Sequence, residues 1–168
     1  MATIDAALTG VLNELIAVQN DRMAAYELAG RETTDTELRT LFDELASRSH
    51  RFSNELSDEV LHLGGIPTTD PTAEGRALRT RMDLTAALSL YDRRAILSAC
   101  AAGESAALRT YREALDSETE LPVREIIESQ FISVRHDHER IRKLRETTTA
   151  VKAAPVPSRR RQPFKLTL

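Results

Sequence analysis

A helical stretch in the second half of the chain reads Cys100-Ala-Ala-Gly-Glu104-Ser-Ala-Ala-Leu-Arg-Thr-Tyr111. Three residues that are common in protein interiors and one acid recur in it at intervals of four, three and four residues: Cys100, Glu104, Ala107 and Tyr111. This spacing places all four on one face of a helix. This face is expected to point into the protein. Because burying a carboxylate without a pair or a metal is costly, we expect a group from another helix to lie opposite Glu104.

The composition favours a single all-α domain with an aliphatic core. The chain has 168 residues, of which 41% are hydrophobic and only 4% aromatic. Ala, Leu, Glu and Arg dominate, and these residues favour helix over sheet. Cys100 is the only cysteine, so no internal disulfide is possible, and a small buried thiol is expected there. With neither a signal-like N-terminus nor an apolar run of about 18 residues, we expect a cytoplasmic protein without a membrane span.

The charges are distributed unevenly along the chain. The formal net charge is −3, yet no acid follows Glu146, and five Lys and Arg residues do. The part before Glu146 is therefore acidic, which argues against nucleic acid bound by a bundle, because phosphate contacts need clustered basic side chains. The arginines of the tail could instead contact an anionic surface or an acidic protein: Arg159, Arg160 and Arg161.

Apolar residues at helical spacing predict four long helices, at about residues 4–29, 34–63, 89–115 and 122–146. Capping-box patterns mark the starts of the second and third, at Thr34-Asp-Thr-Glu37 and Ser89-Leu-Tyr-Asp92. Gly30 is expected to end the first helix, and Gly64-Gly65 the second. The short first connection makes an antiparallel hairpin.

The second connection is long enough to run the length of a bundle and turn the chain back. A short helix is expected in it near residues 78–86, and Asp70 before Pro71 resembles a cap followed by a proline at the first helical position. The end of the chain, residues 147–168, is rich in Pro, Ala and Arg and lacks periodicity. We expect one domain over residues 1–146 and an extended or disordered basic tail after it.

The two hairpins resemble each other in their polar positions. A shift of 85 residues places Gln19 on Glu104 and Tyr26 on Tyr111, and a shift of 89 places Ser49 on His138. The chain thereby resembles a bacterial family of ferritin-like four-helix-bundle proteins with no assigned function, through these helix-face motifs: Leu12-Asn-Glu-Leu-Ile, Leu41-Phe-Asp-Glu-Leu, Gly103-Glu-Ser-Ala-Ala-Leu-Arg-Thr-Tyr111 and His138-Glu-Arg-Ile-Arg-Lys-Leu. The resemblance covers about residues 4–146 and implies two antiparallel hairpins joined by a long crossover.

Ferritin-like carboxylate sites take a single Glu from each of two helices and a Glu-x-x-His pair from each of the other two. In this chain Glu104 is present, but its counterpart is Gln19. The paired motifs read Ala46-x-x-Ser49 and Arg135-x-x-His138, so both of their acids are missing. Candidate ligands are therefore few: Glu104, His138 and His50, the last lying roughly 100° around its helix from the apolar stripe. We expect no bound metal, with iron or manganese as the alternative.

The other interpretation of these residues is a hydrogen-bonded polar belt across the bundle interior. Its expected members share inward helix positions: Gln19, Tyr26, Ser49, Glu104, Tyr111 and His138. A protonated His138 beside an ionised Glu104 would satisfy both groups. Arg22 or Arg135 could supply the counter-charge instead.

The sequence favours a non-enzymatic bundle that acts through self-association, as a homo-oligomer, or through partner binding. It contains no strained nucleophile turn and no phosphate loop, so no catalytic or cofactor-binding residue is expected. Two alternatives stay open. One is a metal-binding or oxidant-handling ferritin relative with a reduced site, and the other is an adaptor that uses its basic C-terminal tail.

Overall fold

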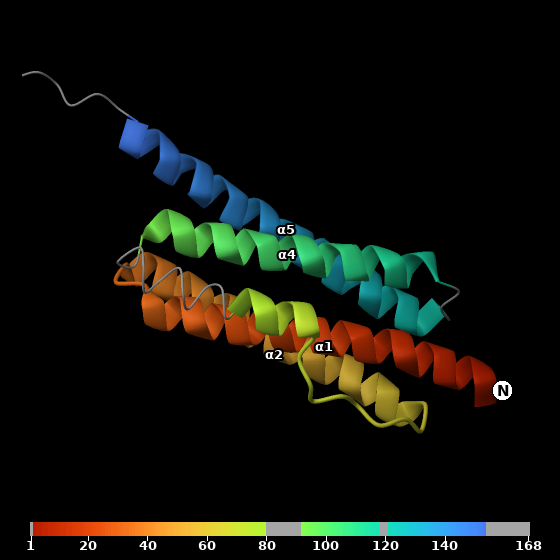
Figure 1. Cartoon of the computed structure of the whole chain (residues 1–168). Helices are drawn as coiled ribbons and strands as arrows, with labels where there is room; N and C mark the ends of the chain where they lie inside the picture. Colours follow the sequence, from red (N-terminus) through yellow and green to blue (C-terminus); the bar gives the residue numbers. More distant parts are fainter. Residues whose placement is uncertain (1, 80–91, 118–120, 154–168) are drawn as a thin grey trace, which may run out of the picture.

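The computed structural model describes residues 2–79, 92–117 and 121–153, and no strand occurs among them. Four long helices make up most of this part: α1 (Ala2–Glu32), α2 (Thr36–His62), α4 (Arg93–Asp116) and α5 (Leu121–Ala153). Residues 73–79 add a helical segment in the connection between α2 and α4. The predicted all-α bundle is confirmed (Figure 1). None of the described helices is long and apolar enough to cross a membrane.

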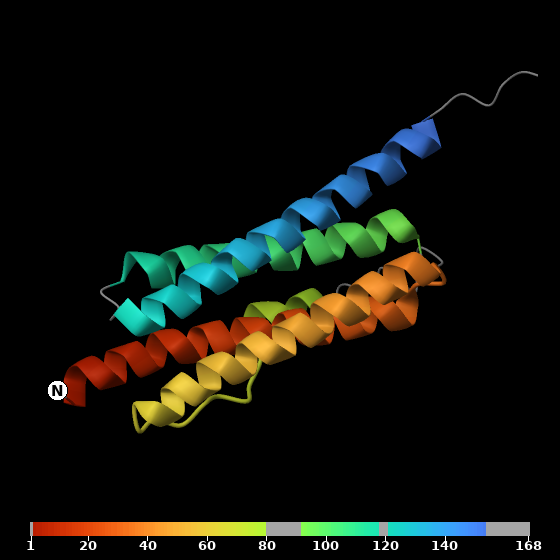
Figure 2. The ribbon, with the colours of Figure 1, turned by 180° about the vertical axis from the view of Figure 1, so that it is seen from behind.

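The helices pair as two antiparallel hairpins. α1 packs along α2, α4 packs along α5, and the hairpins meet mainly through α1 and α4, while α2 and α5 share the smallest interface. The α4–α5 hairpin lies along the α1–α2 hairpin in both views, and the connection after α2 returns along the outside of α1 (Figures 1 and 2). This is the arrangement expected for two hairpins joined by a long crossover.

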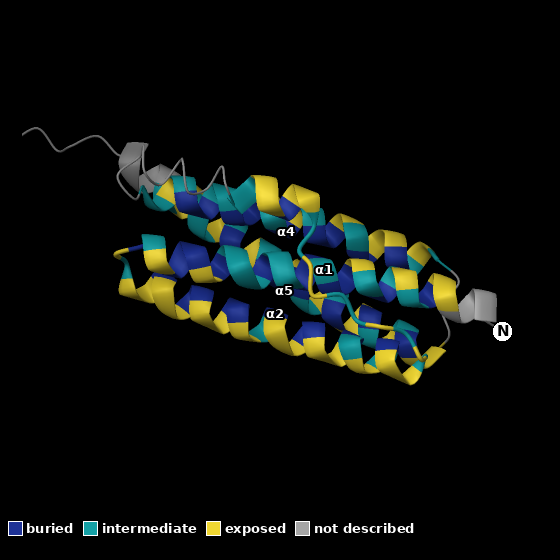
Figure 3. Cartoon of the chain, turned by 60° about the horizontal axis from the view of Figure 1, so that its bottom comes forward, coloured by how far each residue is buried: buried dark blue, intermediate teal, exposed yellow. Residues whose placement is uncertain are grey.

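The interior consists of two apolar clusters. The first contains Leu12, Leu15, Leu56 and Ile127, and the second contains Phe42, Leu45 and Leu97. Five apolar residues that recur at helical spacing in the sequence, and that this spacing predicts to be interior, are buried: Leu45, Phe52, Leu97, Val134 and Ile141. Buried residues face neighbouring helices, whereas exposed residues line the outer faces (Figure 3).

A polar layer separates the two clusters. Each long helix contributes residues to both clusters, and at least one buried polar residue lies between its two contributions. These residues are Gln19 and Arg22 on α1, Ser49 on α2, Glu104 on α4 and Asp137 on α5. The fold thus brings one level of all four helices into a shared polar interior.

Two helix starts differ from the predicted ones. Asp35, not Thr34, caps α2, and its Oδ1 accepts hydrogen bonds from two backbone N–H groups of the first turn at 2.9 and 3.1 Å. Asp92 caps α4 through a 3.4 Å hydrogen bond, whereas Ser89 lies outside the described residues. A carboxylate is favoured at these positions because its negative charge interacts well with the partial positive charge at the N-terminus of a helix.

Two helix ends also lie further along the chain than predicted. α1 continues through Gly30 to Glu32, and α5 continues past Glu146 to Ala153. The Thr148 hydroxyl donates to the Leu144 carbonyl at 2.8 Å within the added part of α5. Residues 147–153 are therefore helical instead of extended, and Arg93 of α4 donates to the Thr148 hydroxyl at 3.2 Å. The rest of the expected tail, with its three arginines, lies outside the described residues.

The crossover segment docks on α1 through Asp21. Thr72, rather than Asp70, caps the helical residues 73–79, since its Oγ1 accepts from the Gly75 N–H at 2.9 Å. Asp21 in turn accepts from the Thr72 N–H at 3.2 Å and pairs with Arg79 at 2.9 Å. The short helix thus begins earlier than predicted, and the remainder of the expected range, 80–86, lies outside the described residues.

Candidate functional site

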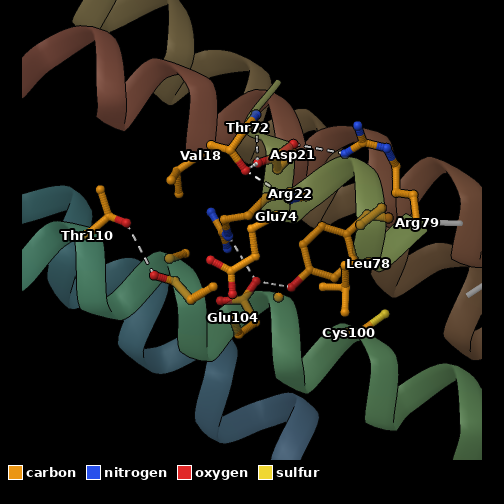
Figure 4. Close-up of a pocket in the computed structure, with 16 residues that line it drawn as sticks. Val18, Asp21, Arg22, Thr72, Glu74, Leu78, Arg79, Cys100, Glu104 and Thr110 are labelled. Atoms are coloured by element: carbon orange, nitrogen blue, oxygen red, sulfur yellow. Dashed lines mark hydrogen bonds and ion pairs between the residues drawn. The ribbon is translucent and has the colours of Figure 1, made fainter. Parts of the chain in front are cut away.

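Arg22 is the centre of the polar layer. It lies three residues after Gln19 and four before Tyr26, so α1 presents all three on one face. Arg22 is 3% exposed, and its Nε donates to Glu104 Oε1 of α4 at 2.9 Å. Its Nη2 donates to Asp137 Oδ2 of α5 at 3.0 Å, and its Nη1 to Gln19 Oε1 at 2.8 Å. The planar guanidinium thereby connects three helices. Figure 4 shows Arg22 facing Glu104.

The fourth helix joins this network through Arg48 of α2. Arg48 Nη1 donates to Asp137 Oδ1, and its Nη2 pairs with Glu44 at 2.8 Å nearer the surface. Two arginines therefore balance the two buried carboxylates, Glu104 and Asp137. Buried ion pairs are tolerated when each charge is compensated and hydrogen-bonded, and that is the arrangement here.

Two tyrosines extend the network. The Tyr26 hydroxyl donates to Glu104 Oε1, and the Tyr111 hydroxyl accepts from Gln19 at 2.5 Å and donates to Gln130 Oε1 at 2.7 Å. Burial, reinforced by Glu104, raises the pKa of Tyr26 well above its ordinary value. Burial also raises the pKa of Tyr111, against the hydrogen bond from Gln19. Both hydroxyls therefore serve as neutral hydrogen-bonding groups.

The same surroundings affect the other ionisable groups of the layer. Burial and then the Glu104 charge raise the pKa of Cys100, which leaves an unreactive thiol. Burial opposes the charge of Arg22, but Glu104, through its charge and its hydrogen bond, acts together with neighbours that include Asp137, and the pKa of Arg22 is raised. The interior thus holds a permanently charged arginine between two acids.

The comparisons with known proteins agree with this architecture. A family model described as a domain of unknown function, DUF2383, matches residues 7–117. The chain belongs to this family. The resemblance seen in the sequence, to ferritin-like proteins without an assigned function, is confirmed by this match and by the fold.

A mutant of Dps1 from Mycobacterium smegmatis is one solved structure that resembles the DUF2383 chain. The TM-score is 0.69 at 9% sequence identity, and the match covers 86% of this chain and 99% of that one. At such low identity the likeness shows the fold alone. None of the curated proteins that were compared is significantly similar.

The structure brings four of the six expected belt residues of the DUF2383 chain into one network: Gln19, Tyr26, Glu104 and Tyr111. Ser49 is buried at the same level, but its hydroxyl donates to the Leu45 carbonyl of its own helix at 2.9 Å. His50 is exposed, with its ring nitrogen 3.5 Å from Asn54.

His138 lies outside the layer, contrary to its predicted pairing with Glu104. It is half-buried and lines a hollow with Arg142, and among the described residues its Nδ1 has no hydrogen-bond partner. α5 instead turns Asp137 inward, three residues after Val134 and four before Ile141. The predicted stripe was off by one residue here, or about 100° of helix rotation.

Sequence reasoning missed Asp137, Gln130 and Arg48, and left Arg22 and Arg135 as alternatives for the counter-charge. The structure selects Arg22, while Arg135 is exposed. The spacing of Asp137 could have identified it as an interior residue, since it continues an apolar series with Val134 and Ile141 at helical intervals. A charged residue in such a series indicates a buried partner elsewhere.

The residues of this layer do not fit a ferritin-like di-metal centre. Within the described ranges, no three His, Cys, Asp or Glu side chains gather closely enough to hold a metal ion. The two interior acids have an arginine between them, and the remaining donors around it, Gln19 and Tyr26, are neutral. A divalent cation needs several anionic or imidazole donors, and here the carboxylate charges are already compensated.

Proposed function

We propose that this DUF2383 protein is a non-enzymatic ferritin-like bundle that holds no metal and acts through association, with itself or with a protein partner. The observation that carries the proposal is the position of the Arg22 guanidinium between Glu104 and Asp137. A metal ion bridging these acids would have to displace a buried, hydrogen-bonded cation. The interior therefore serves to join four helices instead of supporting redox or hydrolytic chemistry.

An association surface is supported by large apolar side chains at one end of the bundle. Leu61 is in the last turn of α2, Ile66 follows in the connection, and Leu121 begins α5; they are 58%, 85% and 75% exposed. The end of α2 and the start of α5 lie at the same end of the molecule as the N-terminus (Figures 1 and 2). Exposed apolar side chains at one end offer a surface that a second copy would cover.

Sedimentation velocity over a wide range of protein concentration tests the association. We expect the wild-type chain to form dimers or larger species and Leu121→Ser combined with Ile66→Ser to shift it toward monomer. Ile132→Ser is the matched control, because Ile132 is 57% exposed but lies along the middle of α5. A wild-type chain that is monomeric throughout, or an equal effect of the control, would count against self-association.

Metal analysis tests the other half of the proposal. Protein purified without a chelator, from cells supplied with iron and manganese, should contain far less than one metal ion per chain. Glu104→Ala should leave that content unchanged. A stoichiometric metal that disappears in Glu104→Ala would instead favour the metal-binding or oxidant-handling alternative.

A further inference from the structure

A cavity of about 90 Å³ lies beside the polar layer, between α1, α4 and the crossover residues 72–79 (Figure 4). Much of its wall is apolar: Val18, Ala25, Leu78, Cys100 and Ala107. A cavity of this volume has room for several water molecules or for one small organic molecule. An apolar wall of this kind favours a ligand with a hydrocarbon body over water alone.

Glu104 is among the residues that line this cavity. Glu104 is 1% exposed, and its Oε1 already accepts from Arg22 and Tyr26. Among the described residues, its Oε2 has no hydrogen-bond partner. An unpaired carboxylate oxygen in an apolar site is costly, so a ligand that donates to it gains a strong, charge-assisted hydrogen bond.

The charges around the cavity indicate that this donor is neutral. Each acid in the lining has an arginine partner: Asp21 with Arg79, Glu74 with Arg109 and Glu104 with Arg22, all at 2.9 Å. The lining therefore has no surplus negative charge to compensate a cationic ligand. A cation would lose its hydration without gaining a counter-ion, whereas a hydroxyl group needs only an acceptor.

We propose that this cavity is a binding site for small neutral alcohols, with the hydroxyl donating to Glu104 Oε2 and the hydrocarbon part lying against Leu78 and Cys100. This ligand class goes beyond the association role proposed above and does not depend on it. The exposed Glu74 lies at the rim, where its pair with Arg109 joins the crossover segment to α4. The site thus connects the crossover segment to the polar layer.

Two isomers test the assignment, because 1-butanol and diethyl ether have the same atoms and only the alcohol donates a hydrogen bond. Calorimetric titration of the full chain should give at least about tenfold tighter binding of 1-butanol, the factor expected for one hydrogen bond to a charged acceptor. Equal affinities for the isomers, or binding of neither, would overturn the proposal. Tighter binding of n-butylammonium than of 1-butanol would overturn the neutral ligand class.

Glu104→Gln gives a second readout. Arg22 and Tyr26 both donate to Oε1, so they hold the amide oxygen there and direct the amide NH2 group into the cavity. The variant should bind diethyl ether more tightly than the wild type does, and the preference for 1-butanol should fall by about tenfold. Ile132→Ser, far from the cavity, should keep the wild-type preference. An unchanged preference in a folded Glu104→Gln variant would show that Glu104 does not bind the hydroxyl.

Discussion

Arg22 is the residue on which the interior depends. Its guanidinium contacts Glu104, Asp137 and Gln19, and an arginine suits this position because its donors form a rigid planar fork that a lysine lacks. Glu104, the acid on the inward face of α4, is therefore compensated by a fixed positive charge from α1. A charge network of this kind makes the interior sensitive to removal of single members.

Replacement of Arg22 by methionine should destabilise the protein by about 3–5 kcal/mol, because two buried carboxylates lose their shared partner. Urea unfolding followed by circular dichroism measures this cost. Adding Glu104→Gln to Arg22→Met should recover part of it, since one uncompensated charge is then gone. Arg135→Met is the control and should change stability by less than about 0.5 kcal/mol, because Arg135 is exposed. Equal costs at the two arginines would contradict the network.

Alkaline pH should destabilise the fold through three buried groups. The pKa values of Tyr26, Tyr111 and Cys100 are raised by burial above ordinary values of 10.0 for tyrosine and 9.0 for cysteine. Above those values the unfolded chain releases protons that the folded chain retains, so the free energy of unfolding falls as pH rises. Each group contributes about 1.4 kcal/mol per pH unit.

Urea unfolding at a series of pH values above 8 measures this slope. Cys100→Ala should remove the loss of stability that begins near pH 9, and Tyr111→Phe should make the fall in the free energy of unfolding above pH 10 shallower. Slopes identical to the wild type in both variants would mean that these groups ionise equally in the folded and unfolded states.

At the scale of elements, Asp21 of α1 is one of the side chains that position the crossover residues 72–79. Asp21 holds Thr72 and Arg79, and Gly75 lies so close that an added Cβ would be 2.0 Å from the Asp21 carboxylate. Only glycine allows this approach. The segment that forms one wall of the cavity therefore depends on the Asp21–Gly75 contact.

Gly75→Ala should cost about 1–3 kcal/mol in the wild type, because the methyl group and the carboxylate compete for the same space. In an Asp21→Ala background the same substitution should be neutral or stabilise by up to about 1 kcal/mol, since alanine is the better helix former. Thermal or urea unfolding of the four proteins measures the coupling. Additive effects would show that Gly75 does not contact Asp21.

At the scale of the whole molecule, the two apolar clusters bury most of the hydrophobic side chains, and the polar layer aligns one hairpin with the other. Residues of four helices must meet at one level to pair Arg22 and Arg48 with Glu104 and Asp137, so a shift of one hairpin along the other would leave charges unpaired. We infer that the layer favours one register of the bundle, as buried polar residues do in coiled coils.

Leu97→Ala should destabilise the protein by about 2–5 kcal/mol, because the side chain is fully buried in the second cluster. Ile132→Ala is the control at an exposed position outside the proposed association surface and should cost less than about 0.5 kcal/mol. Denaturant midpoints of the two variants decide this. A comparable loss at both positions would mean that the burial pattern described here is wrong.

The sequence by itself determined the helices, their pairing into hairpins and most of the core. The spacing of apolar residues along each helix is a local property, and it predicted correctly that Leu45, Leu97 and Ile141 lie in the interior. Glu104 was likewise identified as an interior acid. These features depend on residues a few positions apart, whose relation the helix itself fixes.

Only the tertiary structure decided which partner compensates Glu104 and which residue of α5 faces it. Arg22 lies 82 positions from Glu104 and 115 from Asp137, so their contact depends on how four helices pack and rotate. A rotation of about 100° exchanges His138 for Asp137 while leaving apolar residues on either face. Asp35, and not the predicted Thr34, caps α2, and its second carboxylate oxygen pairs with Arg93 of α4. Such choices are settled by contacts between helices, because local spacing gives neighbouring positions nearly equal support.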